Sequence, residues 1–240
     1  MRAARFGDAT GVTIVAIVGG SLGMGLFVLA SLSGCSRESE RVPRGALVEA
    51  AARGDAVGVR DLLDKGVDVN EKDETGRTAV TAAVYAGSRE VVRRLVAAGA
   101  DVDIQDETRS NAFLALGETG DVGVLDEVLP ARPDVALTNR FGGTALIPAA
   151  DRGHVAMVQA LLDRTDVDVD HVNDLGWTAL LEAVILGDGG RAHQQIVRLL
   201  LEAGADPTVG DGDGVTPLEH ARERGYDRIV AILEGGGATR

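Results

Sequence analysis

The chain has 240 residues and a formal net charge of −13, which limits the partners that it can bind. An acidic surface repels the phosphates of nucleic acids and the headgroups of anionic lipids, so we expect no nucleic-acid partner. Aromatic residues make up 3% of the sequence, against an ordinary apolar total of 45%. A core of small aliphatic side chains suits thin repeated layers, in which each unit touches only its neighbours.

The first 35 residues differ in composition from the rest of the chain. Their start is basic, an apolar stretch occupies residues 12–30, and the sequence Leu-Ser-Gly-Cys follows at 32–35. A charged start, an apolar stretch and small residues at a cleavage site are typical of a secretory signal. Residues 32–35 resemble a bacterial lipobox, and this resemblance implies cleavage before Cys35 and lipidation of the Cys35 thiol.

Two interpretations of this leader stay open. Residues 1–35 are either a cleaved lipoprotein signal peptide, or an uncleaved membrane helix, because an apolar stretch of about 19 residues can span a bilayer. Both interpretations attach the rest of the chain to a membrane, the first through a lipid anchor. We therefore expect the protein in the bacterial cell envelope, facing the periplasm or the exterior. Residues 36–44 are polar and are expected to form a tether.

A unit of 33 residues repeats along the remainder of the chain. The glycines that mark the same point of each unit are Gly54, Gly87, Gly120, Gly153, Gly187 and Gly225. The first four are spaced by 33 residues, and the last two spacings are 34 and 38. We place the five extra residues of the last spacing, 188–192, in a loop that leaves the packed unit unchanged. Self-similarity at this period predicts a solenoid.

The repeated positions resemble those of the ankyrin repeat family. The matching segments are Thr216-Pro217-Leu218, Gly153-His154, residues 196–201, residues 99–103 and Gly204-Ala205-Asp206. The resemblance implies an all-α solenoid of about six helix-turn-helix repeats with β-hairpin-like loops, over residues 45–234. We expect residues 235–240 to be a disordered tail.

Three residues have structural roles that the sequence predicts. Thr78 is expected to cap a first helix through its hydroxyl group. Gly99 is expected to end a second helix in the left-handed conformation that glycine favours. Phe113 occupies an inward leucine position of the repeat and is expected in the core.

The third repeat departs most from the pattern. Arg109 replaces the turn glycine, Asn111 replaces threonine, and Arg132-Pro133 replaces Gly-Ala. Gly117 and Gly123 fall inside expected helices, where each costs about 1 kcal/mol relative to alanine. We therefore expect residues 106–138 to be the softest repeat.

No residue pattern predicts catalysis or metal binding. The three alternating aspartates in residues 166–170 suggest a calcium loop, but His171 and Trp177 occupy the positions where an EF-hand needs Gly and Glu. Asp and Gly are common in turns in any case. The glycine-rich run 187–190 lacks the Lys-Ser/Thr of a phosphate loop. We expect no enzyme activity, no metal, no cofactor and no small-molecule substrate.

Aromatic residues outside the core predict a partner-binding face. By the ankyrin resemblance, Tyr85, Phe141 and Trp177 line the concave face, with Phe141 and Trp177 on hairpin tips. Large aromatic residues and arginine carry most of the energy of protein interfaces. The predicted partner-binding residues are Tyr85, Arg140, Phe141, Asp151, Arg152, Leu175, Trp177, Ile185 and Leu186. The alternative is that Phe141 and Trp177 only pack against adjacent hairpins.

The family resemblance implies protein binding. The predicted function is a membrane-anchored protein–protein interaction module that captures an extracytoplasmic protein on its concave ankyrin face. The alternative is an inhibitor or immunity protein that acts on an extracytoplasmic enzyme or toxin. An acidic body favours a basic partner in both cases, so the residues leave the two open.

Overall fold

A computed structural model gives the fold of residues 5–7, 13–15 and 42–236. The chain forms two compact units that divide after Arg41. The lipidation predicted at Cys35 falls outside the described residues, and so do residues 237–240. Within the described part of the chain, no helix is long and apolar enough to cross a membrane.

The first unit contains one short antiparallel strand pair. Strand β1 (Arg5–Gly7) pairs with β2 (Thr13–Val15), with Phe6 opposite Ile14. The rest of the expected leader and most of the expected tether lie outside the described residues.

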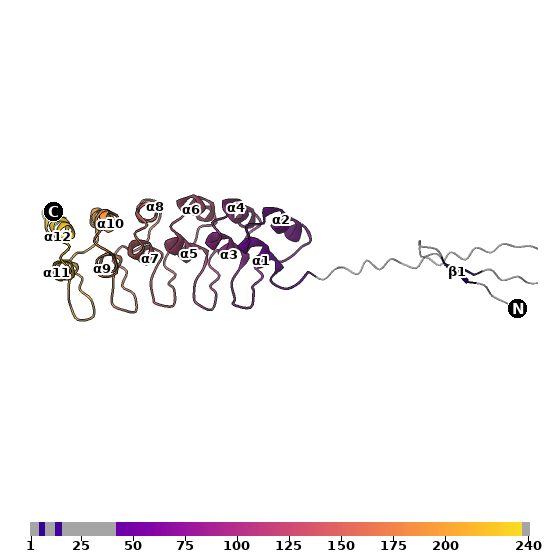
Figure 1. Ribbon diagram of the computed structural model, residues 1–240, viewed down its shortest axis with the longest axis horizontal. Helices are drawn as coiled ribbons and strands as arrows, with labels where there is room; N and C mark the ends of the chain where they lie inside the picture. Colours follow the sequence, from indigo (N-terminus) through magenta and orange to yellow (C-terminus); the bar gives the residue numbers. More distant parts are fainter. Residues whose placement is uncertain (1–4, 8–12, 16–41, 237–240) are drawn as a thin grey trace, which may run out of the picture. The chain divides into compact units, whose positions relative to one another are not determined.

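The second unit is an all-α solenoid of six helix-turn-helix repeats, which confirms the predicted fold (Figure 1). The first helices of the repeats are α1 (Ala46–Ala52), α3 (Ala79–Tyr85), α5 (Ala112–Thr119), α7 (Leu146–Asp151), α9 (Ala179–Ile185) and α11 (Pro217–Glu223). The second helices are α2 (Ala56–Asp64), α4 (Arg89–Ala97), α6 (Val122–Val128), α8 (Val155–Arg164), α10 (Arg191–Glu202) and α12 (Asp227–Gly236), with a short 3₁₀ helix η1 (Leu129–Ala131) after α6. The first helices form one row, the second helices form another, and long loops project beside the first row (Figure 1).

The core lies between the rows and consists mainly of alanine, leucine and valine. In α3, six consecutive residues from Ala79 to Val84 are buried. In α4, the buried residues are Val91, Val92 and Leu95, at the spacing of one helix face. Phe113 is 1% exposed, which confirms its expected place in the core. Such small side chains let the helices of successive repeats lie close together.

One aspartate or asparagine organises each hairpin loop from the second repeat on. Its side-chain oxygen accepts hydrogen bonds from the backbone amides two and four residues later, an Asx turn that fixes the loop. Asp73, for example, accepts from the amides of Thr75 at 2.8 Å and Arg77 at 3.0 Å. The equivalent residues are Asp106, Asn139, Asn173 and Asp211. These turns determine which loop residue points outward.

The helix ends agree only in part with the predictions. Gly99 has φ 86°, as expected for a left-handed residue after a helix. The prediction for Thr78 is wrong, since its side chain makes no capping bond. Its buried hydroxyl lies 3.2 Å from the hydroxyl of Thr81, and this pair satisfies both groups. In α9 and α11, Thr178 and Thr216 do accept capping bonds.

In repeats four, five and six, one side chain at or near the start of the second helix bonds to the preceding repeat. His154 Nε2 lies 3.1 Å from the carbonyl oxygen of Glu118, and His193 Nε2 lies 2.9 Å from that of Asp151. Tyr226 donates its hydroxyl to the carbonyl oxygen of Gly187 at 3.0 Å. Each bond satisfies a carbonyl group near the end of a first helix, where helices leave such groups without a partner.

The insertion at 188–192 is not confined to a loop, which corrects the prediction. Helix α10 begins at Arg191 and has 12 residues, so part of the insertion lengthens the helix. The loop that remains is fixed by Asp188, which accepts from the Gly190 amide at 2.8 Å and lies 2.8 Å from His193 Nδ1. The longer helix places His193 where it reaches the preceding repeat.

The third repeat carries backbone strain at the two predicted positions. Arg109 and Arg132 have φ values of 58° and 55°, in the left-handed region that costs a non-glycine residue about 1 kcal/mol. A slow amide hydrogen exchange in residues 106–138, relative to the other repeats, would contradict our expectation that this repeat opens first.

The prediction that Gly117 only lowers the stability of its helix is wrong. A Cβ atom at Gly117 would collide with the carbonyl oxygen of Ala145 in the next repeat. The missing side chain is therefore what lets α5 approach α7.

We predict that Gly117→Ala destabilises the protein by about 2 kcal/mol, because overpacking outweighs the helix propensity of alanine. Urea denaturation of the full chain measures this change. Gly235→Ala is the matched control: nothing lies within 4 Å of a Cβ atom added to this residue of α12, so its stability should be unchanged or higher. A Gly117→Ala variant that is more stable than the parent would contradict the packing role.

Candidate partner-binding groove

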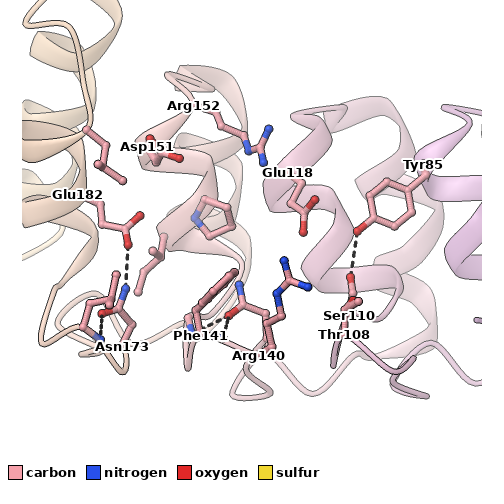
Figure 2. A pocket seen from close by; sticks show the side chains of 16 residues that line it. Tyr85, Thr108, Ser110, Glu118, Arg140, Phe141, Asp151, Arg152, Asn173 and Glu182 are labelled. Atoms are coloured by element: carbon pink, nitrogen blue, oxygen red, sulfur yellow. Dashed lines mark hydrogen bonds between the residues drawn. The ribbon is translucent and has the colours of Figure 1, made fainter. Parts of the chain in front are cut away.

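A groove of about 420 Å³ runs along the first helices and hairpin loops of repeats two to five (Figure 2). Seven of the nine predicted partner-binding residues line it: Tyr85, Arg140, Phe141, Asp151, Arg152, Leu175 and Leu186. The other lining residues are Thr108, Ser110, Glu118, Asn139, Gly143, Ile147, Pro148, Asn173 and Glu182. The structure thus brings together residues that are up to 101 positions apart in the sequence.

The structure places Trp177 and Ile185 outside the groove. Trp177 stands four residues after the loop-organising Asn173, to whose side chain its amide donates at 3.0 Å. Phe141 stands only two residues after Asn139, so the two aromatic residues do not occupy equivalent loop positions. Ile185 is buried, with 9% of its surface exposed. The ankyrin resemblance assigned Phe141 and Trp177 to the same face because it does not distinguish two loop positions. One lies two residues after the loop-organising Asn, and the other lies four residues after it.

Apolar side chains form one part of the groove surface. Phe141, Leu175 and Leu186 are 53%, 55% and 51% exposed. The guanidinium carbon of Arg140 lies 4.8 Å from the ring centroid of Phe141, a cation–π contact that orients the ring. Tyr85 lies at the other end, where its hydroxyl is 3.0 Å from that of Ser110. More than half of the surface of Phe141 is thus open to solvent.

A buried carboxyl group lies among the polar residues of the groove. Glu182, on α9, is only 7% exposed, and its Oε1 accepts a hydrogen bond from Asn173 Nδ2 at 2.8 Å. Burial, together with the nearby charge of Asp151, raises the pKa of Glu182 to about 7. A carboxylate taken out of water without a cation is destabilised in its ionised form. Figure 2 shows Glu182, Asn173 and Asp151 at the α9 end of the groove.

The residues of repeat six that correspond to Asn173 and Glu182 have exchanged roles: the loop supplies the carboxylate and the helix supplies its partner. There His220 stands at the helix position of Glu182, and its Nε2 lies 2.7 Å from Oδ2 of the loop residue Asp211. In repeat five the loop supplies an amide donor and the helix supplies the carboxylate. Sequence reasoning missed Glu182, although the signal was present. The run Thr178-Ala-Leu-Leu-Glu182 has Glu where Thr216-Pro-Leu-Glu-His220 has His.

The charged side chains of the groove are not paired with one another. The charged residues that line it are Glu118, Arg140, Asp151, Arg152 and Glu182. Among the described residues, none of them forms an ion pair within 4.0 Å. The second helices differ, since Glu127 pairs with both Arg89 and Arg93 at 3.1 Å. The charges of the groove thus remain available to a partner.

The aspartates of residues 166–170 serve the loop. Asp168 Oδ1 accepts from the Asp170 amide at 3.1 Å, and Asp170 Oδ1 accepts from the Asp206 amide at 2.9 Å. Within the described ranges, no group of three or more His, Cys, Asp or Glu residues could hold a metal ion.

Comparisons with known proteins agree with this architecture. A family model described as "Ankyrin repeats (3 copies)" matches residues 1–106 and 113–211. The ankyrin repeat protein YahD of Escherichia coli (strain K12) is 51% identical over 83 residues, which cover 35% of this chain and 41% of YahD. The match thus spans about two fifths of that curated relative.

Solved structures match over most of the chain. An ankyrin repeat domain from Acinetobacter baumannii AYE is 46% identical with a TM-score of 0.77, over 81% of this chain and 99% of that domain. The ankyrin repeat protein EF0377 is 39% identical with a TM-score of 0.76, over 80% and 98% of the two chains. A chain in the complex of the predatory endopeptidase Bd0816 with immunity protein Bd3460, from Bdellovibrio bacteriovorus, is 24% identical with a TM-score of 0.63, and covers 79% of this chain and 97% of that one. That likeness concerns the fold alone.

We predict that Glu182→Gln stabilises the protein at high pH. The folded-state pKa of about 7 lies above the ordinary value of 4.5, so the parent loses stability as the pH rises through this range. Glutamine keeps an acceptor for Asn173 and does not ionise. The variant should gain about 2 kcal/mol near pH 8 and almost nothing near pH 5.

Urea denaturation of both full chains across this pH range measures the difference. Asp163→Asn is the control, because Asp163 is an exposed acid on α8 outside the groove. A stability gain for Glu182→Gln that is the same at both ends of the pH range would contradict a buried, titrating carboxyl group.

Proposed function

Because the chain belongs to the ankyrin repeat family, whose members are protein–protein interaction modules, we propose that it captures another protein in the groove. The observation that carries this proposal is the cluster of exposed apolar side chains Phe141, Leu175 and Leu186 within one concave surface. Contiguous exposed apolar surface on a folded protein marks interaction sites. An aromatic ring flanked by arginine is also the composition of interface residues that carry much binding energy.

The geometry suits a partner segment that lies across several repeats. Tyr85 belongs to repeat two and Leu186 to repeat five, so the groove passes over four units of the solenoid. Loop residues two positions after each Asx residue contribute Thr108, Phe141 and Leu175 in turn. A partner would therefore meet a series of side chains on a fixed backbone, and little ordering entropy would be lost on the side of this protein.

We further propose that capture takes place in the bacterial cell envelope, with the protein held at a membrane through Cys35. The support is the leader sequence, with its basic start, apolar stretch and Leu-Ser-Gly-Cys at 32–35. The partner would then be an extracytoplasmic protein.

The groove is tested by crosslinking and pull-down from envelope extracts with the full chain. We predict that Phe141→Ala combined with Leu175→Ser weakens capture about 30-fold, a loss of roughly 2 kcal/mol of interface energy. Both side chains are already more than half exposed, so the melting temperature should stay within about 2 °C of the parent.

The matched control is Val57→Ser, which alters a residue on α2 that is 59% exposed and lies outside the groove. Equal capture by the groove variant and the parent would overturn the proposal. The dissociation rate of a captured complex separates the two roles: hours or longer indicates an inhibitor or immunity protein, and seconds indicates a scaffold.

The anchor is tested by Cys35→Ser. We predict that the variant leaves the membrane fraction, because the thiol that carries the lipid is lost. Fractionation followed by immunoblotting measures this. A variant that stays in the membrane at its unprocessed size would instead indicate an uncleaved membrane helix.

A further inference from the structure

We propose that the groove recognises a lysine or arginine side chain of its protein partner, seated between Asp151 and Glu182. This inference rests on the proposed function and specifies the chemistry of the partner. In repeat five, the loop residue Asn173 supplies an amide and the helix residue Glu182 supplies a carboxylate. In repeat six, the loop residue Asp211 supplies the carboxylate and the helix residue His220 supplies an imidazole.

Glu182 is a buried acid that has no cationic partner among the described residues. Glu182 is only 7% exposed, yet Asn173 gives its side chain one neutral hydrogen-bond donor, and no cation lies within 4.0 Å among the described residues. A buried carboxylate is stable only when it is paired and hydrogen-bonded. A cationic side chain that enters the groove would supply the missing partner.

Charged side chains are unevenly distributed along the groove. Asp151 and Glu182 gather toward α9, whereas the side chains of Arg140 and Arg152 reach toward Glu118 (Figure 2). Asp151 is close enough to Glu182 to raise its pKa. The α9 end therefore presents two mutually repelling carboxyl groups, and a cation between them relieves that repulsion as well as the desolvation of Glu182.

The groove also contains exposed apolar surface. Leu175 and Leu186 are 55% and 51% exposed and line the groove. Leu186 follows Glu182 by four residues, and Leu175 follows Asn173, the hydrogen-bond partner of Glu182, by two. Lysine and arginine have long aliphatic stems that pack on apolar surface while their charged ends reach polar groups. The leucines thus match the stem and the carboxyl groups match the charge. A small inorganic cation would use the carboxyl groups but leave the leucines exposed.

The chemistry of Asn173 agrees with this assignment. Asp73, Asp106 and Asp211 organise their loops with a carboxylate, while repeats four and five use the amides Asn139 and Asn173. The Asn173 amide keeps the turn bonds and also donates to Glu182. An aspartate at this position would place a further negative charge against Glu182. The amide therefore permits a buried carboxylate in the groove without loss of the loop structure.

The test selects peptides from a random displayed library on the full chain. Peptides that compete with one another and fail to bind Phe141→Ala define the groove ligands. We expect these ligands to carry lysine or arginine next to an apolar residue. Replacing that basic residue by norleucine, which keeps the stem, should weaken binding about 30-fold or more, measured by fluorescence polarisation.

The variants Glu182→Gln and Asp151→Asn should each weaken the basic peptide by about tenfold or more and leave the norleucine peptide within about twofold. Asp163→Asn removes one negative charge outside the groove and controls for general electrostatic attraction. Loss of folding does not confound the result, since Glu182→Gln is expected to raise stability.

Groove ligands without basic residues, or equal binding of the basic peptide to Glu182→Gln and the parent, would overturn the inference. In that case, peptides that still depend on Phe141 would leave protein capture by the groove intact. A library that yields no peptide dependent on Phe141 also overturns the inference, while capture of an envelope protein is measured separately by pull-down.

Discussion

The solenoid depends on burial between neighbours, because no single repeat can cover its own apolar faces. The row of first helices and the row of second helices enclose a core of alanine, leucine and valine, and each layer is completed by the next. This constraint fixes the spacing of the repeats closely. Gly117 illustrates it, since the approach of α5 to α7 leaves no room for even a methyl group.

The same constraint leaves the loop tips free to differ. The loops from the second repeat on are held by Asx turns. Those of repeats three to five also bond to the loop before them, as the Asp174 amide does to the Phe141 carbonyl oxygen at 2.9 Å. The residue two positions after the Asx residue contributes no side-chain bond to this scaffold when it is Phe141 or Leu175. The fold therefore does not dictate the identity of these two groove residues.

The fold and much of the groove could be predicted from the sequence, for a physical reason. Period, helix pattern and turn glycines are local properties, so the six repeats and the loop tips carrying Phe141 and Leu175 follow from them. Two of the errors concern contacts with a neighbouring repeat. The roles of Gly117 and the insertion before His193 depend on atoms of the adjacent repeat, which no local pattern contains.

Glu182 was missed for a related reason. On the sequence it is one acidic residue among 37 acidic residues, and a helix position alone does not show that a carboxyl group is buried. Only the packing of α9 against the Asn173 loop removes it from water. Because its pKa is raised, ionisation of Glu182 lowers the stability of the fold. Such destabilising groups in folded proteins concentrate where binding occurs.

The bonds that join successive repeats have an evolutionary consequence. His154, His193 and Tyr226 each contact a backbone carbonyl oxygen of the preceding repeat, a group that every amino acid possesses. The Asn173–Glu182 and Asp211–His220 pairs, by contrast, lie within one repeat. Recombination that duplicates or exchanges whole units would therefore preserve the joints and carry each unit's recognition chemistry intact to a new place in the array.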